Sequence, residues 1–267
     1  MSGSLLIIGY GNMSGAILAG WLADGADPAE FAILNRSAKA APDGVRVYSS
    51  IAEAEGDAPF GAIMLGFKPH QLGDLAADFQ ELSRGIPVYS LLAGITLDQL
   101  RSAFPVAAAH VRVMPNLASR VNKSPVILSE TGLDDAGMTA AFDLFDKLGM
   151  AVWLDDETQF DLATALAGSG PGFVYRFIDA LAGAGAQLGL TQSQAQDLAL
   201  KMVEGAASLA AISSDSPGTL ADKVASPGGM TREGLNVLDA DQALLGLLTE
   251  TLRKTRDRGA ELSQEAK

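Results

Sequence analysis

The sequence contains no cysteine and only two histidines, His70 and His110, among its 267 residues. The absence of cysteine excludes disulfides, thiolate zinc sites and a cysteine nucleophile. No paired-histidine metal signature, GxSxG elbow or Walker-type phosphate loop is present, so we expect no bound metal and no acyl-enzyme chemistry. His110 falls in an apolar, strand-like segment, which favours a buried structural role over a catalytic one.

Basic residues are also scarce. Lys and Arg number 19 against 32 Asp and Glu, so the formal net charge is −13 and the isoelectric point is about 4.5. Nucleic acids and anionic membranes need a positive protein surface, so neither is an expected partner. No uncharged apolar stretch is long enough to span a membrane, and the first residues resemble a strand rather than a signal peptide. We therefore expect a cytoplasmic protein that acts on a small molecule.

Hydrophobic residues make up 48% of the chain although aromatic residues contribute only 6%, so a sizeable core is expected. In the first half, apolar runs alternate with helix-like segments, which is typical of βαβ units around a mainly parallel sheet. From Glu157 onward the strand signal stops and the segments have a helical pattern. The sequence thus predicts an α/β fold, in which a Rossmann-like doubly wound sheet over residues 1–155 precedes an all-helical domain over residues 156–267. The expected strands are 4–8, 31–35, 45–48, 62–66, 87–91, 108–113, 125–128 and 151–154. The expected helices are 13–24, 50–55, 69–82, 96–103, 134–148, 157–168, 171–189, 191–212, 216–226, 229–239 and 241–264.

A glycine turn, Gly9-Tyr10-Gly11-Asn12-Met13, directly follows the first apolar run and opens a helix-like segment. A strand, a tight turn and a helix start place backbone N–H groups and the helix dipole where a pyrophosphate binds. The third glycine that is usual in such turns is absent, because Ser14 stands three residues after Gly11. We expect Gly9, Gly11, Asn12 and Met13 to contact a dinucleotide. The alternative is a glycine turn in an α/β domain that binds no nucleotide.

Asn35, Arg36 and Ser37 stand at the end of the second predicted strand. At an NAD site, an acidic residue about 20 positions past the glycines holds the ribose 2′-hydroxyl. Asn35 takes that place here, while Arg36 and Ser37 offer a cation and a hydroxyl to a 2′-phosphate. We therefore expect NADP(H) in preference to NAD(H). The alternative is an ordinary polar loop.

Two further predicted strands end at the same sheet edge, where ligands of open α/β folds bind. After the first, Phe67 could line the cofactor site and Lys68 could attract a phosphate or carboxylate. If Lys68 and Pro69 only start a helix, the lysine is a solvated surface residue. After the second, Asn116 could bind the cofactor carboxamide or the substrate, or it could only shape a turn.

The helical half contains two glycine-rich breaks. Gly168-Ser169-Gly170-Pro171 could permit close helix packing or the approach of a ligand. In the second break, Ser226 can cap while Gly228 and Gly229 expose N–H groups at the next helix start, which suits a carboxylate. The hydroxyl of Thr231 lies in the first turn of that helix. The alternative for this segment is an ordinary capped loop between helices.

In these motifs the chain resembles the Δ1-pyrroline-5-carboxylate reductase family. The motifs occur in the family's order over nearly the whole chain, and Ser-Pro-Gly-Gly-x-Thr before a helix is the most specific of them. The residues that carry the resemblance are Gly9–Met13, Lys68-Pro69, Val111–Asn116, Ala167–Pro171 and Ser226–Thr231. The departures from the family's pattern leave the cofactor residues in place and bear on substrate choice. These departures are Leu117, Lys123, Phe173, Ala225 and Met230.

The resemblance implies hydride transfer from NADPH to C5 of a cyclic imine, which yields L-proline. It implies that Thr231 hydrogen-bonds the ring nitrogen, and that Ser226 and the N–H groups of Gly228 and Gly229 hold the carboxylate. It also implies that the helical half is a dimerisation domain, that the homodimer is intertwined, and that five dimers can form a decamer.

Three alternatives remain open: a related β-hydroxyacid dehydrogenase, another imine reductase, and a non-catalytic NADP-binding sensor. The β-hydroxyacid dehydrogenase class places a catalytic lysine in its helical domain. Between Glu157 and Gly246 the only lysines are Lys201 and Lys223, and neither stands in such a motif.

Overall fold

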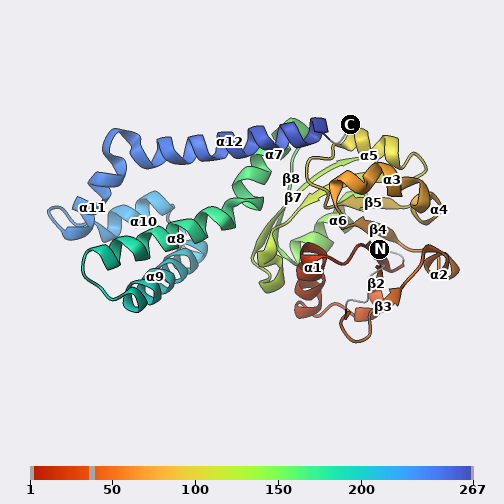
Figure 1. Cartoon of the computed structure of the whole chain (residues 1–267), viewed down its shortest axis with the longest axis horizontal. Coiled ribbons are helices and arrows are strands. Elements are labelled where there is room, and N and C mark those ends of the chain that lie inside the picture. Colours follow the sequence, from red (N-terminus) through yellow and green to blue (C-terminus); the bar gives the residue numbers. More distant parts are fainter. Residues whose placement is uncertain (1–2, 36–39, 266–267) are drawn as a thin grey trace. The chain divides into compact units, whose positions relative to one another are not determined.

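The computed structural model describes residues 3–35 and 40–265, and its central feature is an eight-stranded sheet (Figure 1). The strands are β1 (Leu5–Ile8), β2 (Phe31–Leu34), β3 (Arg46–Tyr48), β4 (Ala62–Leu65), β5 (Pro87–Ser90), β6 (Ala109–Met114), β7 (Ser124–Thr131) and β8 (Gly149–Trp153). Their order in the sheet is β3-β2-β1-β4-β5-β6-β7-β8. All neighbouring strands pair in parallel except β6 and β7, which are antiparallel. The order reverses between β1 and β4, so the sheet is doubly wound as predicted.

Twelve α-helices are assigned among the described residues. Those around the sheet are α1 (Asn12–Ala23), α2 (Ile51–Gly56), α3 (Leu72–Leu75), α4 (Gln80–Ser83), α5 (Leu97–Ala103), α6 (Asp135–Asp146) and α7 (Phe160–Ala163). Those that follow are α8 (Gly170–Gln187), α9 (Gln192–Ile212), α10 (Pro217–Val224), α11 (Met230–Asp239) and α12 (Ala243–Glu265). Short 3-10 turns include η2 (Pro69–Gln71), η3 (Ala76–Phe79), η4 (Leu117–Val121) and η5 (Glu157–Gln159), while η6 (Thr164–Gly168) is a π-helical turn.

Both faces of the sheet are covered, because alternate residues of each buried strand point to opposite faces. In β1, Leu5 and Ile7 pack in the cluster that includes α1 and α6, whereas Leu6 and Ile8 pack in the cluster that includes α3, α4 and α5. On the first face, the indole of Trp21 stacks on Phe31 at a centroid distance of 5.1 Å and its Nε1 donates to the carbonyl oxygen of Leu144. The sheet is therefore fixed between two helical layers.

The strands expected from the sequence are all present, but the helix expected over 69–82 is not continuous. That segment consists of η2, α3, η3 and α4, and the backbone at Phe79 (φ −106°, ψ 10°) departs from α-helical values. Leu72, Phe79 and Leu82 are nevertheless buried at helix-like spacing. The hydrophobic pattern predicted a helical segment here, but such a pattern does not report whether the hydrogen-bond ladder is unbroken.

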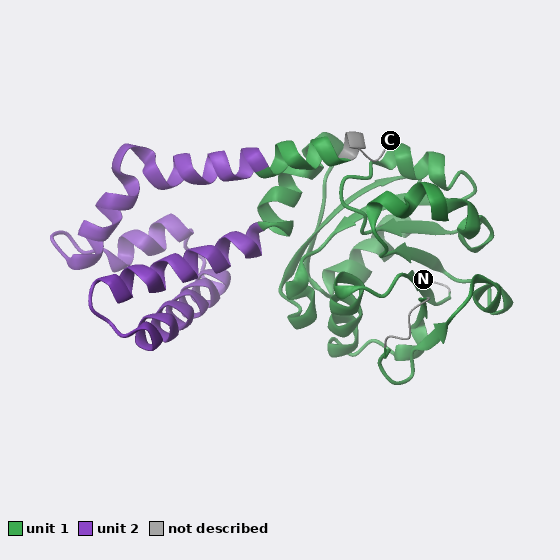
Figure 2. Ribbon diagram, in the orientation of Figure 1, with its two compact units in different colours: residues 1–169, 255–267 green, residues 170–254 purple. Residues whose placement is uncertain are grey.

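The chain divides into two compact units, residues 1–169 with 255–267 and residues 170–254 (Figure 2). The division differs from the predicted one at 155/156, because α7 and η6 pack on β7 and belong with the sheet. The terminal part of α12 belongs there too, where a Cβ on Gly259 would lie 3.4 Å from the Asp161 side chain. The second compact unit therefore begins at Gly170, where α8 starts.

The second unit is built on the antiparallel pair α8 and α9, whose small side chains allow a close approach. Ala182, Ala195 and Ala199 form a buried cluster, against which Ile178 and Ala186 pack. The chain turns between the two helices at Gly189, whose φ is +116°. Side chains disfavour this backbone conformation, which is why glycine suits the position. Other apolar side chains of α8 stay exposed, namely Val174, Phe177 and Leu181.

Candidate functional site

The turn between β1 and α1 brings three backbone segments together. Gly9 has φ +92°, and a Cβ at this position would lie 2.8 Å from the backbone nitrogen of Phe67. A Cβ on Gly66 would lie 2.1 Å from Oγ of Ser14, which donates a 2.8 Å hydrogen bond to the carbonyl oxygen of Gly9. Ser14 thus stands where a third glycine was expected and closes the turn from inside. Gly9 and Gly66 are required by this packing of the two strand ends.

Gly11 differs from Gly9, because it faces open space. Its φ of −83° suits any residue, and the nearest atom to a Cβ there is the carbonyl oxygen of Gly66, at 3.9 Å. Gly11 is the N-cap of α1 and no side chain caps this helix, so the N–H groups of Asn12 and Met13 have no intrahelical partner. Bare N–H groups and the positive end of the dipole are features that favour an anion at the start of α1.

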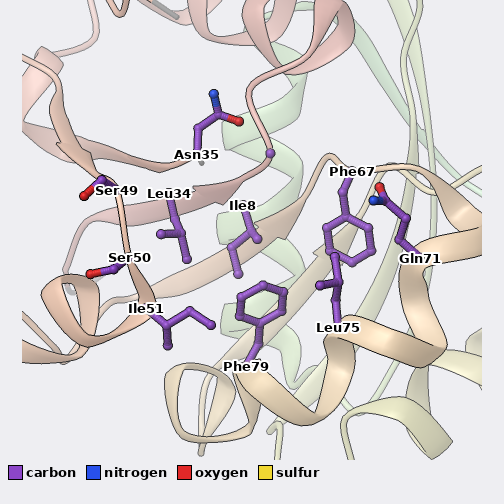
Figure 3. Close-up of a pocket in the computed structure, with 11 residues that line it drawn as sticks. Ile8, Leu34, Asn35, Ser49, Ser50, Ile51, Phe67, Gln71, Leu75 and Phe79 are labelled. Carbon is purple, nitrogen blue, oxygen red and sulfur yellow. The ribbon is translucent and has the colours of Figure 1, made fainter. Parts of the chain in front are cut away.

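A cavity of about 260 Å³ opens beside Gly9 at the carboxyl edge of the sheet (Figure 3). Apolar side chains form most of its wall, and polar groups stand at its rim. The lining residues are Ile8, Gly9, Leu34, Asn35, Ser49, Ser50, Ile51, Phe67, Gln71, Leu75 and Phe79. The rings of Phe67 and Phe79 lie 6.2 Å apart between centroids. An apolar slot with a polar rim suits the faces and the edge of a heteroaromatic base.

Three of the predicted cofactor residues, Gly9, Asn35 and Phe67, line this cavity. Oδ1 of Asn35 accepts a hydrogen bond of 3.4 Å from the N–H of Tyr10, so the end of β2 is tied to the glycine turn. Arg36 and Ser37 lie outside the described residues, and their role stays a prediction. Sequence reasoning missed the lining residues that follow β3 and those of η2, α3 and η3. The third predicted strand ends at Tyr48, so Ser49 and Ser50 follow it at the carboxyl edge of the sheet. Their position after that strand was the signal that could have identified them as lining residues.

Lys68 and Pro69 do not line the cavity. The backbone N–H of Lys68 donates a 3.0 Å hydrogen bond to Oε1 of Gln71, and its side chain is exposed. Pro69 begins η2, where its fixed φ suits the first helical position. The geometry is that of a helix start, so a contact of either residue with a cofactor stays a prediction.

Asn116 points into the protein rather than toward the cavity. It is 5% exposed, its Oδ1 accepts from the N–H of Ala118 at 2.8 Å, and its Nδ2 donates to the carbonyl oxygen of Ala167 at 2.9 Å. Its own N–H donates to Oγ of Ser124. The structure therefore gives this residue the turn-shaping role and a further contact with Ala167, directly before the Gly-Ser-Gly-Pro break. A cofactor contact of Asn116 stays a prediction.

The Ser-Pro-Gly-Gly break joins α10 to α11 in the second unit as a tight β-turn. The N–H of Gly229 donates a 2.9 Å hydrogen bond to the carbonyl oxygen of Ser226, and Gly228 has φ +71°. Pro227 at the second position and glycine with positive φ at the third are typical of a type II turn. The N–H of Gly229 thus has a partner within the turn, and a contact of Gly228 and Gly229 with a carboxylate stays a prediction.

The helix that follows the turn has an open start. Gly229 is the N-cap of α11 and provides no side-chain cap, so the N–H groups of Met230 and Thr231 have no intrahelical partner. The side chains of Ser226 and Thr231 are exposed. The loop thus presents two hydroxyls and a bare helix start, which can bind an anion and donate a hydrogen bond.

The two histidines take no part in these sites. Nε2 of His110 lies 2.9 Å from the carbonyl oxygen of Phe104, and burial lowers the pKa of this imidazole. His70 is exposed in η2. Across residues 3–35 and 40–265, no group of three His, Asp or Glu side chains is arranged to hold a metal ion. In the same ranges, no helix is both long and apolar enough to cross a membrane.

Comparison with known proteins identifies the family. Residues 157–262 match the family model described as pyrroline-5-carboxylate reductase dimerisation. The chain is 30% identical over 264 residues to pyrroline-5-carboxylate reductase 2 of Bacillus subtilis, covering 97% of this chain and 94% of the relative. Its fold is similar to a pyrroline-5-carboxylate reductase structure from Coxiella burnetii (TM-score 0.89, 30% identity, 98% and 99% of the two chains). It is also similar in fold to the Plasmodium falciparum pyrroline carboxylate reductase with NADP bound (TM-score 0.84, 22% identity, 98% of each chain). The glycine turn, the doubly wound sheet and the helical dimerisation domain are thus those of a known oxidoreductase family, and this chain belongs to the pyrroline-5-carboxylate reductase family.

Proposed function

We propose that this chain reduces Δ1-pyrroline-5-carboxylate to L-proline with NADPH, as the last step of proline biosynthesis. The observation that carries the proposal is the contrast between helix starts. Five helices, α2, α5, α6, α9 and α10, begin on a Ser, Thr or Asp side chain that accepts a first-turn N–H. By contrast, α1 and α11 begin on Gly11 and Gly229 without any side-chain cap. The short helices α3, α4 and α7 also lack a side-chain cap, but each of them continues a 3-10 turn, whereas α1 and α11 each follow a glycine loop. Both bare starts leave N–H donors for an anion, and the cofactor and the substrate are both anions.

The residues at the sheet edge fit a dinucleotide. The bare start of α1 would hold the diphosphate, to which Gly11 allows a close approach because no Cβ stands there. The cavity beside Gly9 would hold the adenosine. The end of β2 offers Asn35 rather than a carboxylate, so a 2′-phosphate is not repelled, and Arg36 and Ser37 would bind it. When bound, NADPH supplies the hydride for the reduction.

The turn before α11 fits the substrate. Ser226 and the N–H groups of Gly228 and Gly229 would hold the carboxylate, and the bare N–H groups at the start of α11 offer further donors to the same anion. The hydroxyl of Thr231 would hydrogen-bond the ring nitrogen. A protonated cyclic imine is already electrophilic, so the site needs a donor that orients the ring more than it needs a strong general acid. The exposed Thr231 hydroxyl supplies such a donor.

A homodimer would complete the site. The chain carries the family's dimerisation domain over residues 157–262, and Val174, Phe177 and Leu181 leave an apolar stripe on α8 exposed. Burial by a second copy would remove that stripe from water. In this arrangement the turn with Thr231 serves the cofactor held by the neighbouring subunit, and dimers can assemble further into a decamer.

The test of the function is the oxidation of NADPH on addition of Δ1-pyrroline-5-carboxylate, followed in parent protein and in Thr231→Ala. We expect the parent to oxidise NADPH with a higher kcat/KM than NADH. In Arg36→Ala the loss of a phosphate contact should cost about 1.5–3 kcal/mol with NADPH. Thr231→Ala should lower kcat by about tenfold to a thousandfold. A parent that binds NADPH without reducing the imine would instead be a sensor, and one that uses a hydroxyacid would be a dehydrogenase.

Subunit mixing tests the shared site. Thr231→Ala chains and Gly11→Ala chains, each impaired alone, should gain activity when they exchange subunits at an NADPH concentration too low to saturate Gly11→Ala, since one of the two sites in a mixed dimer then carries neither change. If mass measurement shows exchange and activity does not return, each site belongs to a single chain.

A further inference from the structure

Arg232 follows Thr231 directly, and its side chain reaches back over the Ser226–Gly229 turn. Its Nη2 donates to Oδ1 of Asp222 at 2.8 Å and to the carbonyl oxygen of Ala225 at 3.3 Å. Asp222 lies in the last turn of α10, and Ala225, which is buried, ends that helix. One guanidinium nitrogen therefore joins the start of α11 to the end of α10, across the turn that separates them.

This contact lies beside the proposed substrate-binding residues Ser226 and Thr231, but it involves neither of their side chains. Ser226 follows Ala225 on the α10 side of the turn, and Thr231 precedes Arg232 on the α11 side. The turn's own hydrogen bond, between Ser226 and Gly229, closes the loop locally. The Arg232 contact adds a second constraint, which fixes the end of α10 relative to the start of α11. The spacing between the Ser226 and Thr231 hydroxyls depends on both constraints.

We infer that Arg232 is a positioning residue for substrate binding, which sets the distance between the carboxylate-binding and ring-nitrogen-binding ends of the Ser226–Thr231 turn. The inference rests on the proposed function. Arg232 acts through the backbone and not by direct charge, because its cation is already paired with Asp222 and its side chain is only 31% exposed. The Ala225 carbonyl that Arg232 holds directly precedes Ser226, so loss of Arg232 disturbs the carboxylate end most, and contacts with the carboxylate act in the ground state as much as in the transition state.

Kinetics of Arg232→Ala test this inference. We expect KM for Δ1-pyrroline-5-carboxylate to rise about tenfold, which corresponds to a loss of about 1.4 kcal/mol. The change in kcat should be smaller, because the lost binding is uniform, and KM for NADPH should not change. Arg232→Lys should recover part of the affinity, since it keeps a cation beside Asp222. The matched control is Arg84→Ala, which removes an exposed arginine paired with Glu81 at the end of α4 and should leave both KM values unchanged.

Asp222→Ala separates positioning from direct attraction. If Arg232 positions the turn, Asp222→Ala also raises KM for the substrate, and the double variant is no worse than Arg232→Ala alone. If Arg232 attracts the carboxylate directly, Asp222→Ala frees its charge and lowers KM, and the inference is wrong. Asp222 is 73% exposed, so this variant keeps the test decisive even if Arg232→Ala does not fold.

Amide hydrogen exchange gives a readout that does not depend on activity. In the cofactor-free protein, Arg232→Ala should speed exchange of the N–H of Gly229, which the turn protects, and Arg84→Ala should not. Unchanged exchange together with unchanged substrate KM would overturn the inference while the reductase assignment stands. A parent protein without reductase activity would overturn the proposed function, and with it the inference about substrate binding. The exchange rates would still report whether the Arg232 contact stabilises the Ser226–Gly229 turn.

Discussion

Nδ2 of Asn116 donates a 2.9 Å hydrogen bond to the carbonyl oxygen of Ala167, which lies 51 residues further along the chain. This bond joins the end of β6 to the π-helical turn η6, directly before the break at Gly168–Pro171. The two motifs were identified separately in the sequence, and the structure shows that one positions the other.

We predict that Asn116→Ala lowers the free energy of unfolding by about 1–3 kcal/mol, because the half-buried Ala167 carbonyl and Ala118 N–H both lose a partner. Urea unfolding measures this change. Ser102→Ala is the control, since it removes only an exposed hydroxyl bonded within α5. Equal stability of Asn116→Ala and the parent would show that the contact contributes nothing.

A second prediction concerns Arg112, whose side chain is 5% exposed on β6. Its guanidinium lies 2.8 Å from Oε1 of Glu157 and 3.8 Å above the ring centroid of Phe160. Burial lowers the pKa of Arg112, while Glu157 and Asp161 oppose that shift. Arg112→Ala leaves Glu157 without its cation, so we expect a loss of about 3–5 kcal/mol in the free energy of unfolding.

The exposed Arg84–Glu81 pair is the control for Arg112. Arg84→Ala should change the free energy of unfolding far less than Arg112→Ala does, because solvent screens an exposed pair. Denaturant unfolding measures both losses in the free energy of unfolding. Similar losses for Arg84→Ala and Arg112→Ala would contradict the prediction that a buried pair costs more to break than an exposed one.

His110 makes stability depend on pH. Burial lowers the pKa of its imidazole in the folded protein, so the unfolded chain binds a proton more readily. The stabilisation that comes from neutral His110 is complete above the unfolded pKa of about 6.5, and it is lost as the pH falls below that value. Unfolding free energies between about pH 7.5 and 5.5 should therefore fall more steeply for the parent than for His110→Gln. If the unfolding free energies of the parent and of His110→Gln fell equally with pH, His110 would not be the source of the pH dependence.

The two glycines of the first turn should respond differently to alanine. Gly11→Ala is compatible with the backbone and has free space for the Cβ, so thermal unfolding should match the parent while NADPH affinity falls by about tenfold or more. Gly9→Ala should unfold at lower temperature, because φ is +92° and the Cβ would meet the Phe67 backbone. Titration of NADPH into folded Gly11→Ala provides the measurement. Parent-like affinity would place the diphosphate elsewhere.

Patterns in the sequence predicted the sheet well, because each buried strand is a short apolar run that ends in polar or glycine residues. The same patterns placed Gly9, Asn35 and Phe67 at the carboxyl edge of the sheet, because each of them stands at or just after the end of a predicted strand. They could not distinguish the required Gly9 from the open Gly11, since that difference depends on how closely Phe67 and Gly66 approach the turn.

Side-chain direction explains most of the remaining differences. Asn116 was placed correctly at a strand end, but only the structure shows that its amide turns inward to Ala167. The Gly229 N–H could not be assigned from the sequence, because its partner depends on the turn type. Arg232 drew no attention in the sequence, since its contact with Asp222 requires α10 and α11 to fold back on each other.

The central claim is hydride transfer to the cyclic imine, and isotope transfer tests it most directly. NADPH carrying deuterium at both C4 positions of the nicotinamide is incubated with the parent protein and Δ1-pyrroline-5-carboxylate, and the product is analysed by mass spectrometry and NMR. We predict one L-proline formed for each NADPH oxidised, with a single deuterium at C5. Oxidation of NADPH without proline, or proline without deuterium at C5, would contradict the proposed function.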